Sequence, residues 1–294
     1  MPRIVQVVFE GRLGNNMFQY AFGRALADLW GAELQTPDWI GQAIFTDAGS
    51  KPLSADTGRV YNQEIPALDT TDEVVILKGF WQATKFLNFY SREQVRQWFA
   101  LREEIRLKQD GEKYVAFHIR RGDMAENKAE WATIDRDAYG IAIAKRGFDN
   151  LPIVEVSELS PHTAPSILEP SLQFIIDFQI LMDATVIFRA NSSFSWWAAT
   201  LGSPMAVFSP QVKGKYGEVI AHFEQGNHCA FTSGVDSPDV ELLNDVDWAS
   251  EFTFEREGVW WLVDMEQAEH GPFPTEQAAR LEVYKLAVAN SDIG

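Results

Sequence analysis

The sequence predicts an α/β protein whose parallel sheets are covered by helices on both faces. Short apolar, β-branched runs alternate with stretches of helical apolar spacing up to about residue 210, and this alternation is typical of parallel sheets. The polar turn KQDGEK, which begins at Lys108, interrupts the alternation near its middle. A chain of 294 residues allows one large or two moderate domains, and the turn favours two.

The first half of the chain begins with strand, loop and helix. We expect a first strand at Ile4 to Phe9, and residues 17–30 have the apolar spacing of a helix. Further strands are expected at residues 33–35 and 74–77. Residues 91–107 are expected to form a helix that begins at a Ser cap.

The second half repeats the alternation. We expect strands at residues 114–119, 152–156, 185–188 and 205–208, and helices at residues 134–146, 171–183 and 193–201. The strand at 205–208, which precedes Pro210, is expected to be the last of this half.

The C-terminal region has a different composition. Residues 233–250 are polar and acidic, which indicates a second boundary. From Glu251 the chain is expected to form a hairpin around residues 258–273 and a helix from Thr275. The predicted organisation is therefore 1–110, 111–235 and a small acidic α+β module at 250–294.

The charge balance restricts the partners. The net charge is −17, and residues 231–294 alone hold 3 basic and 14 acidic residues. An acidic chain does not favour nucleic acid, so an anionic ligand needs a local cluster of Arg. The N-terminus resembles a strand and not a signal peptide. The longest apolar region is interrupted by Asp177 and Asp183, so no membrane segment is expected. With one cysteine, Cys229, we expect a cytoplasmic protein.

The first of three candidate loops follows the first strand. Residues 11–19 carry two glycines and two asparagines before a helix. Glycine lets a ligand approach the backbone, and asparagine both donates and accepts hydrogen bonds. The alternative is a tight turn between strand and helix, which an isolated GxxGNN string favours over a binding role.

The second loop, HIRRGD at residues 118–123, follows another expected strand. Its two guanidinium groups provide planar donors that suit phosphate oxygens. A diphosphate would explain two arginines at this point of an acidic chain. The alternative is a cluster of surface salt bridges.

The third loop carries Asn191, Ser192 and Ser193 at the start of an expected helix. Hydroxyl and N–H groups at a helix start can bind an anion or a ribose. The alternative is a simple N-cap. For Trp196 and Trp197 we expect packing in the core.

Other catalytic patterns are weak or absent. The acidic pairs at residues 135–137 and 245–247 have the spacing of a metal-binding pair, but neither follows a convincing strand, so we interpret both as solvated. The sequence has no HExxH, GxSxG or GxxxxGK[ST] string.

Taken together and in order, four strings resemble the α-1,2-fucosyltransferase family: GRLGNNMFQYAFGRALA, GFWQATKF at 79–86, HIRRGD, and DFQILMDATVIFRANSSFSWWAATLG. The resemblance covers about residues 3 to 210. It implies a GT-B-like fold with two Rossmann-like domains facing across a cleft. It also implies an inverting, metal-independent enzyme without a cofactor, which moves fucose from GDP-fucose to the 2-hydroxyl of galactose in a glycan acceptor.

The resemblance also implies roles for individual residues. Arg120 would bind the diphosphate and stabilise the departing GDP, and Asn15 would lie near the reacting carbon. The other residues expected to bind the sugar nucleotide are Gly11, Arg12, Gly14, Asn16, His118, Arg121, Asp123, Asn191, Ser192, Ser193, Phe194 and Ser195.

The sequence departs from the family pattern at several positions. Asn16 replaces the usual Gln, Met124 replaces a common aromatic residue, and SEL at 157–159 replaces an acidic string. Asp123 and Glu158 are candidate general bases, and neither is singled out. Two alternatives stay open: another nucleotide sugar as donor, or a non-catalytic protein that binds nucleotide sugars and uses the acidic tail as a partner surface.

Overall fold

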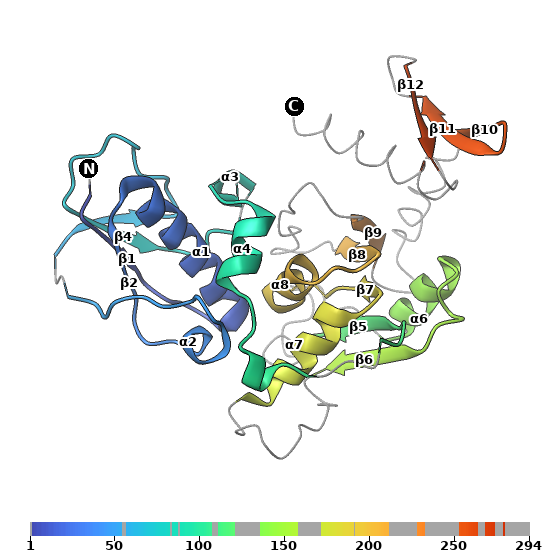
Figure 1. Cartoon of the computed structure of the whole chain (residues 1–294), viewed down its shortest axis with the longest axis horizontal. Coiled ribbons are helices and arrows are strands. Elements are labelled where there is room, and N and C mark those ends of the chain that lie inside the picture. Colours follow the sequence, from blue (N-terminus) through green and yellow to red (C-terminus); the bar gives the residue numbers. More distant parts are fainter. Residues whose placement is uncertain are drawn as a thin grey trace.

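The structure, a computed structural model, contains two parallel sheets and one antiparallel sheet (Figure 1). It describes residues 2–54, 57–82, 84–87, 89–107, 111–120, 136–157, 172–190, 192–211, 228–232, 253–263, 268–273 and 279. The parallel sheets with their helices confirm the predicted α/β class. Within the described ranges, no helix combines the length and the apolar character that a membrane span requires.

The first sheet has the strand order β2-β1-β4-β3, and all its pairs are parallel. Its elements are β1 (Ile4–Val7), α1 (Leu13–Trp30), β2 (Glu33–Gln35), α2 (Gly41–Ile44), β3 (Arg59–Asn62), β4 (Val74–Lys78), α3 (Thr84–Leu87), α4 (Arg92–Trp98) and the 3-10 turn η1 (Glu103–Ile105). The edge strand β3 and the short helix α2 were not predicted, because neither has a long periodic pattern.

Two helices of this half differ from the prediction. Helix α1 begins at Leu13, so Gly14 and Asn15 lie in its first turn and not in a loop. Helix α4 ends at Trp98, well before residue 107. It ends there because Leu101 forms a β-bridge with Phe45, which requires extended backbone. The predicted cap of α4 is confirmed: Ser91 accepts a hydrogen bond from the Gln94 N–H in a capping box.

The second sheet has the order β6-β5-β7-β8-β9, again with parallel pairs only. Its elements are β5 (Val115–Ile119), α6 (Arg136–Lys145), β6 (Ile153–Ser157), α7 (Phe174–Asp183), β7 (Val186–Phe188), α8 (Ser193–Leu201), β8 (Ala206–Gln211) and β9 (His228–Thr232). The expectation that the strand before Pro210 is the last one is wrong. Strand β8 continues through Pro210, which pairs with Phe231 of β9. The pairing of β8 with β7 ends at Phe208, so Pro210 has a neighbouring strand on one side only, and such a position tolerates proline.

A small antiparallel sheet lies in the C-terminal region (Figure 1). It consists of β10 (Thr253–Arg256), β11 (Val259–Val263) and β12 (Glu269–Phe273). The predicted hairpin is therefore present and has an additional strand on one side. The predicted boundary at 233–250 lies outside the described residues, as does the predicted helix from Thr275 except for Ala279.

The two parallel sheets are joined by a continuous buried cluster between α1 and α8. The ring of Phe18 packs against Trp196 and Trp197 at centroid distances of 4.6 and 4.8 Å. Both tryptophans are fully buried, which confirms the prediction that they pack in the core. The Trp197 indole N–H also donates to the Gly14 carbonyl at 3.0 Å, so the starts of the two helices are held together.

Helix α4 holds the other end of α8. The Arg92 guanidinium donates to the carbonyls of Thr200, Ala199 and Gly202 at 2.8 to 3.2 Å. Arg96 donates to Thr200 and Gly202 as well. These carbonyls lie in the last turn of α8, where a helix lacks internal partners and attracts positive charge. Both ends of α8 are therefore fixed to the first half of the chain.

Candidate functional site

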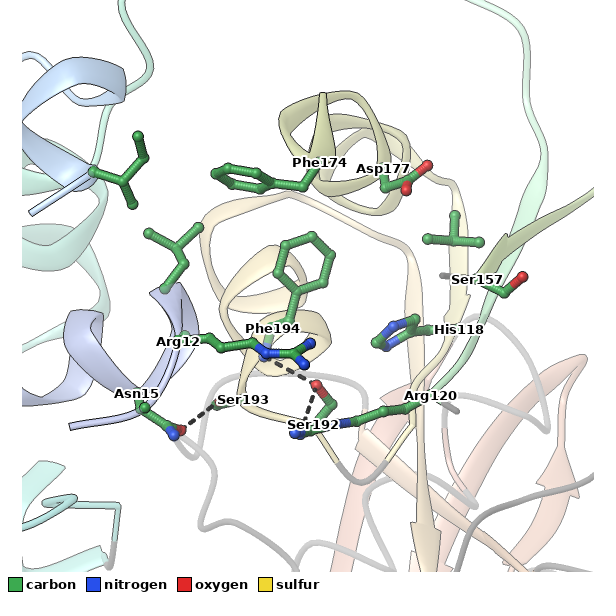
Figure 2. A pocket seen from close by; sticks show the side chains of 15 residues that line it. Arg12, Asn15, His118, Arg120, Ser157, Phe174, Asp177, Ser192, Ser193 and Phe194 are labelled. Carbon is green, nitrogen blue, oxygen red and sulfur yellow. Dashed lines mark hydrogen bonds between the residues drawn. The ribbon is translucent and has the colours of Figure 1, made fainter. Parts of the chain in front are cut away.

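A cavity of about 440 Å³ lies where the two parallel sheets meet (Figure 2). Its walls come from the carboxyl ends of strands and the starts of helices, where open parallel sheets bind ligands. The lining residues are Gly11, Arg12, Leu13, Gly14, Asn15, Ile40, His118, Arg120, Val156, Ser157, Phe174, Asp177, Ser192, Ser193 and Phe194.

The start of α1 supplies the wall from the first half. Arg12 is the residue before α1, and Figure 2 shows its side chain reaching toward Ser192 and Phe194 of the second half. Asn15 accepts a hydrogen bond from the Ser193 hydroxyl at 2.9 Å. Gly11 has a φ of +83°, a backbone conformation that favours glycine, and it lets the loop pass close to Asn15.

The end of β5 supplies the second wall. All five residues of β5 are buried, and Arg120 follows directly. The Arg120 guanidinium donates to the Ser192 hydroxyl at 3.4 Å. Behind it, the Tyr139 hydroxyl of α6 donates to the carbonyls of His118 at 2.6 Å and Arg189 at 3.3 Å. Tyr139 therefore fixes the ends of β5 and β7 relative to each other.

The start of α8 forms the floor of the cavity. Ser192 is the N-cap of this helix, and its hydroxyl accepts from the Phe194 N–H at 3.3 Å. The predicted cap is thus present, and its residue also bonds Arg120. A helix N-terminus beside two guanidinium groups is a strongly positive site, which suits a diphosphate.

The opposite end of the cavity has a different chemistry. Phe174 and Asp177 come from the first turn of α7. Figure 2 shows them on one side of Phe194, with Arg12 and Arg120 on the other. The rings of Phe174 and Phe194 approach at 6.5 Å between centroids. This end offers aromatic surface and a carboxylate acceptor, so the cavity is polarised from a cationic to an acidic end.

The structure brings together nine of the residues that the sequence singled out. They are Gly11, Arg12, Gly14, Asn15, His118, Arg120, Ser192, Ser193 and Phe194. Three others, Arg121, Asp123 and Asn191, lie outside the described residues, as does Glu158.

Two predicted binding residues are placed in the scaffold and do not line the cavity. The Asn16 amide donates to the Glu10 carbonyl and to the Gln19 side chain. The Ser195 hydroxyl donates to the carbonyls of Ala190 and Ser192. Both side chains lie away from the cavity for the same reason: in a helix, neighbouring residues point to different faces, so only part of each string reaches the cavity.

No protein-family model and no curated protein sequence matches the chain. Among solved structures, the fucosyltransferase NodZ from Bradyrhizobium is similar with a TM-score of 0.47 and 17% identity, over 69% of this chain and 94% of NodZ. NodZ α-1,6-fucosyltransferase soaked with GDP-fucose gives 0.46 and 17%, over 69% and 93%. The iron-containing dodecameric glycosyltransferase TibC from enterotoxigenic E. coli H10407 gives 0.39 and 11%, over 71% and 58%. Because the similarity is this low, the functional assignment rests on the site.

His118 is a titratable group in the cavity wall whose pKa is strongly lowered by its surroundings. Its side chain is 6% exposed, and Nδ1 has no hydrogen-bond partner among the described residues. Burial lowers the pKa of His118 to about 3, and the charges of Arg120 and Arg189 add to this. The imidazole is therefore neutral near pH 7 and can bond a ligand oxygen.

We expect this histidine to make the fold sensitive to acid. Its folded pKa lies below the usual value of about 6.5, so the unfolded chain binds more protons between these two values. Stability is then lost as the pH falls through that window. From about pH 7 to about pH 5, wild type should lose about 2 kcal/mol more than His118→Gln. Urea unfolding at each pH measures this, and parallel curves for the two proteins would contradict it.

Sequence reasoning missed the acidic end of the cavity. Asp177 was noted only because it interrupts an apolar stretch, together with Asp183. The signal that identifies it is its position in the first turn of an otherwise apolar helix whose neighbours Ile176 and Phe178 are buried. A carboxylate at such a position, on a helix that lines the cavity, marks Asp177 as a candidate ligand-binding residue.

Proposed function

We propose that the chain is an inverting glycosyltransferase of the GT-B type that moves fucose from GDP-fucose to a hydroxyl group of a glycan acceptor. The observation that carries this proposal is the convergence of Arg120, Ser192 and the start of α8 with Arg12 and Asn15 in one cavity. The first group comes from the second sheet and the other from the first. A transferase of this type holds the nucleotide on one side and the acceptor on the other. Such an enzyme requires that both sheets contribute residues to the donor site.

The cationic end of the cavity fits the diphosphate. Guanidinium forks and helix N–H groups bind phosphate oxygens with short, charge-assisted bonds. As the bond between the sugar C1 and the phosphate oxygen breaks, its electron pair passes to GDP and negative charge grows there. Arg120 lies where it can stabilise this charge without reorganisation. The positive side chains thus take the role of a leaving-group site that needs no metal ion.

The acidic end favours guanine over uracil. Guanine presents two adjacent donors, N1–H and the 2-amino group, whereas uracil presents one N–H. A carboxylate such as Asp177 accepts both guanine donors, and Phe174 and Phe194 offer apolar surface to a base. The polarity of the cavity therefore matches the two ends of GDP.

The finer assignment rests on the four motifs. Their order resembles the α-1,2-fucosyltransferase family, so the proposed donor sugar is fucose and the proposed acceptor is the 2-hydroxyl of galactose. The acceptor oxygen attacks C1 opposite the leaving GDP, its proton passes to a base, and the configuration is inverted in this single displacement. Asp123 and Glu158 stay the candidates for that base.

Calorimetry with GDP, UDP and GDP-fucose tests the donor site. We expect GDP to bind more tightly than UDP. Asp177→Asn should weaken GDP binding by about tenfold, because a charged hydrogen-bond partner of the base is removed, and should change UDP binding less. Asp149→Asn, at an exposed position in the turn after α6, is the matched control. Equal affinity for GDP and UDP in the wild type would refute the assignment of guanine as the preferred nucleobase.

Transfer itself distinguishes an enzyme from a binding protein. With GDP-fucose and a panel of glycans, we expect free GDP to be released only when an acceptor with a suitable hydroxyl is present. Nucleotide binding without any such release would support the non-catalytic alternative.

A further inference from the structure

A chain of three side chains runs from the loop after β4 to the start of α8. The Gln82 amide donates from Nε2 to Oδ1 of Asn15 at 2.9 Å. The Ser193 hydroxyl donates to the same oxygen at 2.9 Å. Gln82 does not line the cavity, whereas Asn15 and Ser193 do. Gln82 is therefore connected to the cavity through Asn15.

The two hydrogen bonds determine which atom of the Asn15 amide is bonded within the protein and which is left for the cavity. An asparagine amide has one acceptor oxygen and one donor nitrogen. Because Oδ1 accepts from both Gln82 and Ser193, the remaining group is Nδ2 with its two hydrogens. Nδ2 lies beside Gly11, where an added Cβ would come within 2.2 Å of it. Gly11 lines the cavity, so the bare backbone there leaves room for the amide nitrogen.

Gln82 is itself held by a constrained loop. The preceding residue, Trp81, is fully buried and has a φ of +57°, which is costly for a bulky residue. Its ring is stacked on Phe22 at 4.6 Å between centroids. The buried Gln19 side chain donates to the Gly79 carbonyl at 3.1 Å. Backbone strain of this kind persists where packing over-determines it, often next to functional groups.

We infer that Gln82 is a positioning residue that orients the Asn15 amide so that its NH₂ group, and not its carbonyl, faces the sugar nucleotide. This inference rests on the proposed function. The reason is electrostatic: an N–H donor stabilises the oxygen that becomes negative as GDP departs, whereas a carbonyl oxygen in the same place repels it. A flipped amide has almost the same shape, so only the hydrogen bonds to Oδ1 select the orientation.

Gln82→Glu tests this with almost no change of shape. The introduced carboxylate only accepts, so it binds Nδ2 and turns the carbonyl toward the cavity. The measurement is NMR of the side-chain amide resonances in the protein without ligand. The Asn15 NH₂ signals are assigned by their loss in Asn15→Ala. We expect these signals to shift in Gln82→Glu and to shift less in Gln82→Met. Unchanged Asn15 signals in Gln82→Glu would overturn the inference, whatever the protein binds.

Binding of GDP gives the second readout. We expect Gln82→Glu to weaken the binding of GDP by about tenfold. Gln82→Met should weaken it by less, because Ser193 still donates to Oδ1 of Asn15 in that variant. In an Asn15→Ala background the Gln82→Glu change should have no effect. The exposed Gln97→Glu of α4 controls for the added charge. An equal loss in both Gln82 variants, or a loss that persists without Asn15, would mean that Gln82 only supports the fold.

These outcomes separate the two proposals. If wild type binds neither GDP nor GDP-fucose while the amide signals respond as expected, the proposed function fails and the orientation of Asn15 by Gln82 stands. If GDP binds but the amide signals do not respond, the inference about Gln82 fails and the proposed nucleotide site stands. If Gln82→Glu folds poorly, Gln82→Met replaces it in both measurements. Its amide signals and its affinity for GDP are then compared with and without the additional change Asn15→Ala.

Discussion

Arg120→Ala should lower kcat for transfer by about 10² to 10³, because it removes a preorganised donor from the oxygen on which negative charge develops. The guanidinium follows a fully buried strand and bonds the N-cap hydroxyl of α8. Its position is therefore set before the ligand binds, and little energy is spent in reorganisation. Steady-state kinetics with GDP-fucose and an acceptor measures the loss.

Two further variants make the test specific. Arg120→Lys keeps the positive charge but loses the planar fork, so its kcat should lie between those of wild type and Arg120→Ala. Arg136→Ala removes an arginine from the same half of the chain that is 69% exposed and bonds Glu155, and it should leave kcat unchanged. Turnover near that of wild type in a folded Arg120→Ala protein would refute the proposed role, and with it the leaving-group site.

The sequence identified the parts of the site that are marked by local patterns. The Arg120 loop directly follows an apolar run, and Ser192 opens a helix with hydroxyl residues. Both patterns depend on neighbouring residues only, since strand ends and helix caps are local features. This is why the strand before Arg120 and the helix start after Ser192 were placed correctly.

Features that depend on distant contacts could not be predicted. The start of α1 looked like a turn because Gly14 and Asn15 are turn-forming residues. Packing against α8 keeps them helical, and that contact joins residues about 180 positions apart. The link between Gln82 and Asn15 spans 67 positions, and the cavity role of Asp177 depends on how α7 packs. No periodic pattern records such contacts.

The contact at Gly14 leads to the second large effect. A Cβ added to Gly14 would lie 2.6 Å from the Ser193 hydroxyl oxygen and 2.7 Å from both the Phe194 nitrogen and the Ser193 carbonyl carbon. Two of these three atoms belong to the backbone, so no side-chain rotation relieves the overlap. The start of α8 must move away from α1, although Trp197 and Arg92 tie α8 to the first half.

We therefore expect Gly14→Ala to reduce both stability and activity. Overpacking of this kind costs about 1 to 3 kcal/mol in unfolding free energy, which urea denaturation measures. Transfer should fall by about 10²-fold, because a displacement of about 1 Å in positioned groups has that effect. Arg12 and Asn15 at the start of α1 would then lie at a different separation from Ser192 at the start of α8.

A second glycine serves as a control that distinguishes the packing overlap at Gly14 from the general effect of replacing a helical glycine with alanine. Gly140 lies in α6, and a Cβ added there would have no neighbour within 4 Å. Gly140→Ala should stabilise the protein by about 1 kcal/mol, since alanine favours a helix, and should leave transfer unchanged. Because the overlap at Gly14 lies between the two halves of the site, Gly14→Ala must also weaken GDP binding. If GDP bound to it as tightly as to wild type, the starts of α1 and α8 would not together form the donor site.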